Sequence, residues 1–104
     1  MRIRYTPEAR ADLAEIRSYI GKMLQNPTAA SRTVAGITKE CGRLKDYPNL
    51  GMSLEAKTGL RSEYRFLLCG KHIAFYRIEG NWISIIRILD GRTDYLKRLF
   101  HEPE

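Results

Sequence analysis

The sequence contains few of the residues that would place it in a secreted, membrane or metal-binding class. It has two cysteines, four prolines and one tryptophan among 104 residues. Two cysteines cannot build the disulfide framework of a small secreted domain, and no apolar run approaches the roughly 20 residues of a membrane span. Residues 1–5 also lack the apolar stretch of a signal peptide. We therefore expect a cytoplasmic protein with reduced thiols and no membrane association.

Signatures of common catalytic and metal sites are missing as well. The sequence has no glycine-rich phosphate loop, no HExxH motif and no GxSxG motif. Its two histidines and two cysteines lack the spacing of metal ligands, and Cys41 and Cys69 are expected to be structural. The sequence thus predicts neither a metal nor a cofactor.

The composition that is present indicates one globular domain, residues 1–104. Hydrophobic residues make up 43% and charged residues 29%, and the length suits a single domain. The net charge is +6, with nine basic and five acidic residues in positions 1–50 and nine and seven in positions 51–104. This excess has no basic tail, and nucleic acid, an anionic surface and an acidic protein all remain possible partners.

The first half of the chain predicts a short strand and two helices. Residues 2–5 alternate like a strand, and Thr6-Pro7 and Asn26-Pro27 are typical helix starts. Apolar residues then recur with helical periodicity, at Ala9, Leu13, Ile16 and Ile20 and at Ala30, Val34, Ile37, Cys41 and Leu44. The short link between these segments indicates an antiparallel helical hairpin.

The second half predicts a sheet. Residues 60–68, 72–78 and 82–89 are rich in β-branched and aromatic residues and are separated by short hairpin loops. We expect three consecutive antiparallel strands with the last one central, and Asp94 could cap a helical turn ending at Phe100. The predicted fold is α+β with the order β-α-α-β-β-β, a helical hairpin packed on an antiparallel sheet.

A small basic fold of this kind could cleave RNA. The reaction needs a base, an acid and cations that stabilise the phosphorane. The candidates are Arg61, His72, Arg92 and Tyr95, with Arg65, Tyr76 and Arg87 also available, and Arg61, Arg65 and Arg87 fall on predicted strands. Structural roles are the alternative for each: a polar strand start for His72, a packed aromatic for Tyr76, and solvated or protein-contacting positions for the arginines. No spacing forces these residues into one site.

Several motifs together resemble a known superfamily. The segments Y-T-P-E-A at 5–9, G-L-R at 59–61, F-Y-R at 75–77 and R-I-L-D-G-R-T-D at 87–94 occur in this order. They resemble the ParE branch of the RelE/ParE toxins of type II toxin–antitoxin systems, over essentially the whole chain. The resemblance implies the same β-α-α-β-β-β order.

The resemblance implies one of two activities. RelE-like members cleave mRNA on the ribosome and usually carry an arginine three residues before the strand tyrosine, where this chain has Ile73. ParE-like members are described as inhibiting DNA gyrase by binding, without catalytic residues, and Ile73 favours this branch. That branch usually has histidine where this chain has Asp90, which could alter target contact or pair locally with Arg92.

The resemblance also implies partners and sites. We expect a non-enzymatic gyrase inhibitor, held in a hetero-oligomeric complex by an acidic, ParD-like antitoxin, with DNA contacted only through the antitoxin. The candidate target-binding residues are Arg61, Arg87, Asp90, Arg92 and Asp94. The candidate antitoxin-binding residues are Leu13, Ile16, Tyr19, Ile20, Val34 and Ile37. A ribosome-dependent mRNA endoribonuclease and a degenerate, non-toxic antitoxin-binding module are the alternatives.

Overall fold

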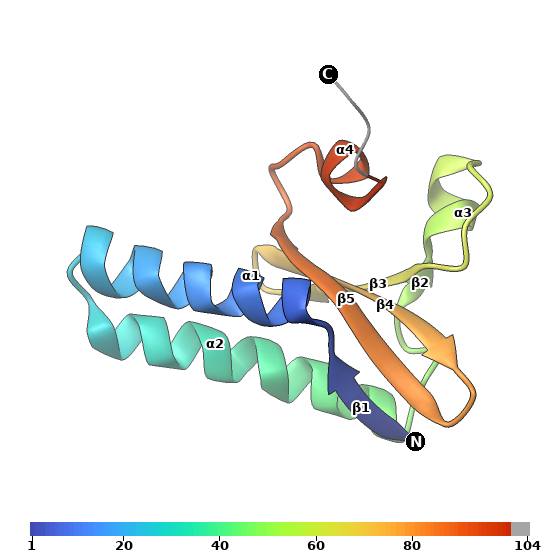
Figure 1. Ribbon diagram of the computed structural model, residues 1–104, viewed down its shortest axis with the longest axis horizontal. Coiled ribbons are helices and arrows are strands. Elements are labelled where there is room, and N and C mark those ends of the chain that lie inside the picture. The colour runs from blue at the N-terminus through green and yellow to red at the C-terminus, as the bar shows by residue number, and fades with distance from the viewer. Residues whose placement is uncertain (101–104) are drawn as a thin grey trace.

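The computed structural model describes residues 1–100 and contains every predicted helix and strand. It also contains a two-residue strand and a short helix between residues 52 and 58 that the sequence did not predict. In chain order the elements are β1 (Arg2–Tyr5), α1 (Pro7–Ser18), a π-helical turn (Tyr19–Met23), α2 (Pro27–Gly42), a 3-10 turn (Arg43–Lys45), β2 (Met52–Ser53), α3 (Leu54–Thr58), β3 (Arg65–Cys69), β4 (His72–Glu79), β5 (Trp82–Asp90) and α4 (Tyr95–Phe100). Figure 1 shows α1 and α2 side by side along the sheet, with α3 and α4 beyond it.

The helical hairpin forms as the sequence predicts. The Thr6 hydroxyl accepts the Ala9 N–H at 3.1 Å, and the Asn26 side chain accepts the Ala29 N–H at 3.0 Å. These two caps satisfy N–H groups that have no partner inside the helix. Gly21, in the π-helical turn, allows close packing, because a Cβ at this position would lie 3.6 Å from the Cβ of Ala30.

The five strands form a sheet in the order β1-β5-β4-β3-β2. The predicted antiparallel pairing of β3, β4 and β5 is confirmed, but β1 pairs parallel with β5, from Arg2 opposite Trp82 to Tyr5 opposite Ile85. The sheet is therefore mixed, which corrects the prediction of a wholly antiparallel sheet. Parallel neighbours need a long connection, and here it comprises the helical hairpin and three strands. The apolar β5 is an inner strand, although β4 occupies the middle position.

The segment before β3 also differs from the prediction. Ser53 caps α3 by accepting the Ala56 N–H at 3.2 Å, and Gly59, with φ of 78°, ends this helix. The strand predicted over residues 60–68 therefore begins only at Arg65. The Ser53 cap starts α3 at Leu54. This residue is 1% exposed and anchors the helix against the sheet.

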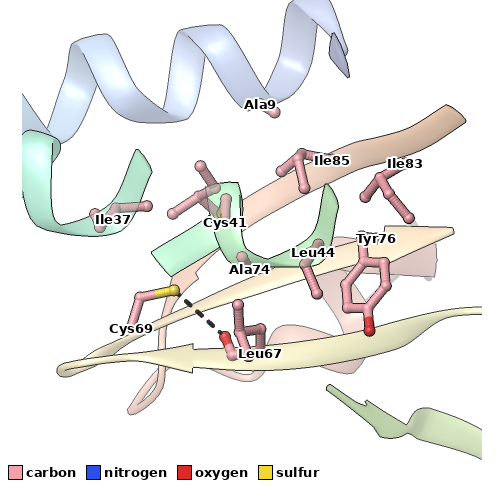
Figure 2. Close-up of a cluster of buried hydrophobic side chains, with 11 residues drawn as sticks. Ala9, Ile37, Cys41, Leu44, Leu67, Cys69, Ala74, Tyr76, Ile83 and Ile85 are labelled. Atoms are coloured by element: carbon pink, nitrogen blue, oxygen red, sulfur yellow. Dashed lines mark hydrogen bonds between the residues drawn. The ribbon is translucent and has the colours of Figure 1, made fainter. Parts of the chain in front are cut away.

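The sheet separates two apolar clusters, one on each face. The inner cluster lies between the sheet and the helical hairpin (Figure 2) and consists of Ala9, Ile37, Cys41, Leu44, Leu67, Cys69, Ala74, Tyr76, Ile83, Ile85 and Ile88. The outer cluster lies beneath α3 and α4 and consists of Leu54, Phe66, Ile73, Phe75, Leu89 and Leu99. Both cysteines are free and buried, which confirms their structural role.

Tyr76 holds the segment before β2 onto the sheet. Its ring is fully buried, and its hydroxyl donates to the Pro48 carbonyl at 2.7 Å and accepts the Gly51 N–H at 3.1 Å. Arg65 donates to the Gly51 carbonyl at 2.6 Å. A Cβ at Gly51 would lie 2.5 Å from the Phe66 carbonyl oxygen. Tyr76 and Arg65 thus have structural roles here, and only glycine fits position 51.

Candidate functional site

A cleft of about 200 Å³ opens between the end of α1 and the adjoining ends of β4 and β5. Its apolar lining consists of Ile16, Ile20, Ile88 and Leu89. Its polar lining consists of Asp12, Glu15, Tyr19, Lys71, His72, Asp90, Arg92 and Arg98. The fold therefore brings His72, Asp90 and Arg92, predicted as ribonuclease or target-binding residues, together with three of the candidate antitoxin-binding residues, Ile16, Tyr19 and Ile20.

Asp90 and Arg92 form a local ion pair in the turn after β5. Arg92 donates from Nε to Asp90 Oδ1 at 3.1 Å and from Nη2 to Oδ2 at 3.0 Å, and its backbone N–H donates to Oδ1 at 2.8 Å. These hydrogen bonds lower the pKa of Asp90 to about 2. The carboxylate is therefore ionised at neutral pH and opposes the charge that Arg92 would offer to a phosphate.

His72 begins β4 directly across from Asp90. Its side chain lies at the cleft, but the residue is only 6% exposed. Burial lowers the pKa of His72, with Lys71 and Arg92 acting in the same direction and Asp90 opposing them. The imidazole is therefore neutral at pH 7 and adds no cation to the cleft.

The other two ribonuclease candidates lie outside this cleft. The ring of Tyr95, at the start of α4, packs against Phe75 in the outer layer with the ring centroids 5.4 Å apart. Arg61 is exposed in the loop between α3 and β3. Neither residue lines the cleft that contains His72 and Arg92. The structure thus brings together only two of the four residues proposed for RNA cleavage.

Ile73 occupies the position at which the RelE-like branch usually has an arginine. It is 7% exposed and lies in the outer cluster with Phe75 and Leu89. Leu99 of α4 belongs to the same cluster and is 4% exposed. Where the RelE-like branch usually has a cation, this chain has a buried apolar side chain, and α4 packs against the cluster that contains it.

A buried ion pair between α1 and β5 was not predicted from the sequence. Arg87 donates to both carboxylate oxygens of Asp12, from Nε at 2.8 Å and from Nη2 at 2.9 Å. Asp12 also accepts the Ile88 N–H at 2.8 Å, in the part of β5 that lies past its pairing with β1. Hydrogen bonding to Asp12 raises the pKa of Arg87. An acidic residue next to the apolar stripe of α1 is the only sequence signal for this contact.

This ion pair changes the interpretation of Arg87. The Arg87 side chain is 14% exposed, compared with 82% for Arg92. Its guanidinium fixes α1 against β5 and supplies a hydrogen bond to a buried carboxylate. Among the candidate target-binding residues, Arg61, Arg92 and Asp94 are exposed, whereas Arg87 is only partly exposed.

The candidate antitoxin-binding residues are mostly covered by the chain itself. Ile20, Val34 and Ile37 are 8%, 7% and 2% exposed, and Leu13 and Ile16 pack against the inner cluster. The helical stripe faces the sheet, so these five residues are largely covered by the chain, although Ile16 and Ile20 also line the cleft. Only Tyr19, with 55% exposure, is freely accessible.

Exposed apolar side chains instead gather at the free end of the hairpin. Met23 is 73% exposed and Leu24 is 55% exposed, and both follow Tyr19 closely in the chain. Of these three side chains, Tyr19 also lines the cleft.

The described residues 1–100 contain no group of three or more His, Cys, Asp or Glu side chains that could hold a metal ion. Across the same residues, no helix is both long and apolar enough to cross a bilayer.

Comparison with known proteins agrees with this fold. Comparison with curated protein sequences found no match. A chain in the structure titled "Chromosomal ParDE TA system from P. aeruginosa" has a TM-score of 0.73 and 26% identity, over 86% of this chain and 95% of that one. A chain of the toxin–antitoxin complex RelBE2 from Mycobacterium tuberculosis has a TM-score of 0.60 and 22% identity, with the same coverage of 86% and 95%.

The helical hairpin, the mixed sheet and the short C-terminal helix define a toxin of the RelE/ParE fold class. The family described as "ParE toxin of type II toxin-antitoxin system, parDE" matches residues 3–95. This chain belongs to that ParE toxin family, which confirms the resemblance inferred from its motifs.

Proposed function

We propose that this toxin inhibits DNA gyrase by binding to it and catalyses no reaction of its own. The observation that supports this proposal best is the burial of Ile73 among Phe75, Leu89 and Leu99, at the position where a ribonuclease of the superfamily needs a cation. Loss of one electrostatic contact to a transition state commonly costs about 10²–10³ in rate. Arg87 is bound to Asp12 and its side chain is only 14% exposed, so it does not replace the missing charge.

The turn after β5 is the best candidate for the gyrase contact. Arg92 and Asp94 have exposed side chains, at 82% and 65%, and Asp90 orients Arg92 by hydrogen bonding. Arg61 is a second exposed candidate. Arg87 is left out of this contact because its guanidinium is bound to Asp12.

Two assays on the purified chain, carried out without antitoxin, test the proposal. We expect inhibition of gyrase supercoiling that decreases in Arg92→Ala, with Arg32→Ala as a control that removes an exposed arginine from α2. In a translation-coupled RNA cleavage assay we expect intact mRNA. If ribosome-bound mRNA is cut by the wild type and spared by Arg92→Ala, the chain is a RelE-like ribonuclease and the proposal is wrong.

We further propose that a cognate antitoxin, acidic and ParD-like, neutralises the toxin in the cytoplasm. Two structural neighbours come from the ParDE and RelBE2 toxin–antitoxin systems, and an acidic segment would complement a net charge of +6. The exposed apolar end of the hairpin, at Tyr19, Met23 and Leu24, is the proposed docking surface. Tyr19→Asp should weaken the complex, whereas Tyr47→Asp, at an exposed tyrosine elsewhere, should not.

The pair of Asp90 and Arg92 supports a second candidate, a member of the family that binds antitoxin without being toxic. Asp90 is an anion where ParE-like toxins usually have histidine, and it occupies both Nε and Nη2 of Arg92. Strong expression without antitoxin distinguishes the two candidates. Growth arrest supports the gyrase proposal, whereas unchanged growth that becomes arrest in Asp90→His supports the non-toxic member.

A further inference from the structure

A band of arginine and aromatic side chains crosses the part of the outer sheet face that lies beyond the outer cluster. On β1, Ile3 and Tyr5 pack toward the inner cluster, so the alternating Arg2 and Arg4 face outward. We call this set the guanidinium band, and it consists of Arg2, Arg4, Tyr64, Arg77, Glu79 and Trp82.

Trp82 orders the first two arginines of the band. The guanidinium carbons of Arg2 and Arg4 lie 4.5 Å and 4.9 Å from the centroid of its ring. Arg4 Nε also donates to Ser84 Oγ at 2.7 Å. Each cation–π contact of this kind contributes about 0.5–1 kcal/mol at an exposed site. The two guanidinium groups are thereby held in place before any ligand binds.

Glu79 connects Arg4 to Arg77. Its two carboxylate oxygens lie 3.4 Å from Arg4 Nη2 and 3.4 Å from Arg77 Nη2. Arg77 also lies over the ring of Tyr64, at 5.5 Å from its centroid. Three arginines and one glutamate leave the band with a net charge of 3 − 1 = +2. The side chains of Arg4 and Arg77 remain 48% and 36% exposed, so the charge is accessible.

We propose that the guanidinium band binds the phosphodiester backbone of duplex DNA. Neighbouring strands lie about 4.8 Å apart, and β5 separates β1 from β4, so the Arg4 and Arg77 positions are roughly 10 Å apart. Arginine offers a planar fork of N–H donors that matches phosphate oxygens.

An acidic peptide fits this surface less well than DNA. Protein partners concentrate their binding energy in apolar or aromatic anchors that fill pockets, and the faces of Trp82 are approached by arginines. The cleft beside α1 and a second cleft between α2 and the β3–β4 turn are lined by other residues. Phosphate contacts need no such anchor, because they depend on charge and hydrogen bonds.

This inference goes beyond gyrase binding and does not depend on it. It also departs from the sequence-based expectation that DNA is reached only through the antitoxin. A toxin that acts on a DNA-bound enzyme gains local concentration if it contacts the same DNA.

Fluorescence anisotropy of a labelled 20-base-pair duplex, titrated with the purified full chain at several salt concentrations, tests the proposal. The variant Arg2→Ala/Arg4→Ala/Arg77→Ala removes the band. The control Arg10→Ala/Arg17→Ala/Arg32→Ala removes three exposed helical arginines and leaves the same net charge. We expect the slope of log K against log salt to be less steep in the band variant, by about 2.7. Between 50 and 200 mM salt, the affinity of the wild type should therefore fall about 40-fold more than that of the band variant. The control should keep the wild-type slope.

The single tryptophan of the chain locates the binding event, because Trp82 lies between the band arginines. Its emission should change when duplex is added, and it should not change with poly-L-glutamate at the same charge concentration. Equal losses in the two triple variants, no binding by the wild type, or tighter binding of poly-L-glutamate than of duplex would each overturn the proposal. Circular dichroism of both variants verifies folding, and the supercoiling assay tests gyrase inhibition separately.

Discussion

The outer face of the sheet has two halves that differ in what they contain and what covers them. One half carries Ile73, Phe75 and Leu89 beneath α3 and α4, and every member of this cluster is at most 7% exposed. The other half carries Arg77 on the same strand, together with Arg2, Arg4, Glu79 and Trp82, outside both apolar clusters, and Tyr64 lies at the border with the outer cluster. The change from apolar to charged residues takes place within β4, next to the register shift at Phe75/Tyr76.

This difference shows how one sheet can serve stability and recognition together. The covered half buries apolar surface, which stabilises the fold by about 25 cal/mol per Å². The open half keeps charges hydrated, where ion pairs add little stability but remain available to a ligand. The superfamily position that would need an arginine for RNA cleavage falls in the covered half, at Ile73. The cations lie in the other half.

Placing a charge in the covered half should have the largest effect. Ile73→Arg should lower the free energy of unfolding by about 3–5 kcal/mol, because the guanidinium would be buried without a partner. Urea denaturation followed by circular dichroism measures this change. Ile73→Val, which keeps the site apolar, should cost only about 0.5–1.5 kcal/mol. If Ile73→Arg were as stable as wild type, α4 would not seal this half.

Removing the contact between α4 and the sheet should have the next largest effect. Leu99 is 4% exposed in the outer cluster, and Leu99→Ala should cost about 2–3 kcal/mol, at the low end for a buried leucine, since a short helix can readjust. Leu60→Ala, at a residue that is 52% exposed, should stay within about 0.5 kcal/mol. Equal losses in these two variants, measured by urea denaturation, would show that α4 adds no stability.

Substitutions in the open half should have small effects on stability. Arg4→Ala and Arg77→Ala each break one partly exposed contact with Glu79, and each should change the free energy of unfolding by about 0–1 kcal/mol. A double-mutant cycle with Glu79→Ala measures the two coupling energies. A loss above about 2 kcal/mol in either variant would mean that the band is part of the core. That result would contradict the distinction between the covered and open halves of the outer face.

The smallest expected effect is a change in acid sensitivity. Hydrogen bonding from Ser84, together with Arg77 and Arg4, lowers the pKa of Glu79. Because the folded pKa lies below the ordinary value of about 4.5, the ionised carboxylate stabilises the fold above that pH, and this stabilisation is lost as the pH falls. Glu79→Gln should flatten the pH dependence of the unfolding free energy between pH 5 and 3, whereas Ile73→Val should retain it. A Glu79 titration midpoint above 4.5 by NMR would contradict this assignment.

Much of the fold was predictable because its signals are local. Thr6 and Asn26 cap the helices as expected, and the stripe residues from Ala9 to Leu44 are largely buried. Strand β4 begins at His72, as predicted. The parallel pairing of β1 with β5 could not be read in this way, because it joins residues about 80 positions apart and depends on how the helical hairpin crosses the sheet.

The candidate site was less predictable than the fold. The pairing of Asp90 with Arg92 was anticipated as an alternative, since the two are separated by a single residue. The pairing of Asp12 with Arg87 spans 75 positions, and no pattern in either segment indicates it. The antitoxin-binding residues remain a prediction, because a helical apolar stripe predicts burial but does not say whether the chain or a partner covers it.

By itself, the sequence determined the types of most elements, their order and the family, because periodicity, caps and motifs act over a few residues. Only the tertiary structure decided which half of the outer face is covered, that Arg87 pairs with Asp12, and how the arginines of β1 and β4 meet around Trp82 and Glu79. Those outcomes depend on strand register and layer packing, which bring distant residues together. A difference of one residue in register would move each of these side chains to the opposite face.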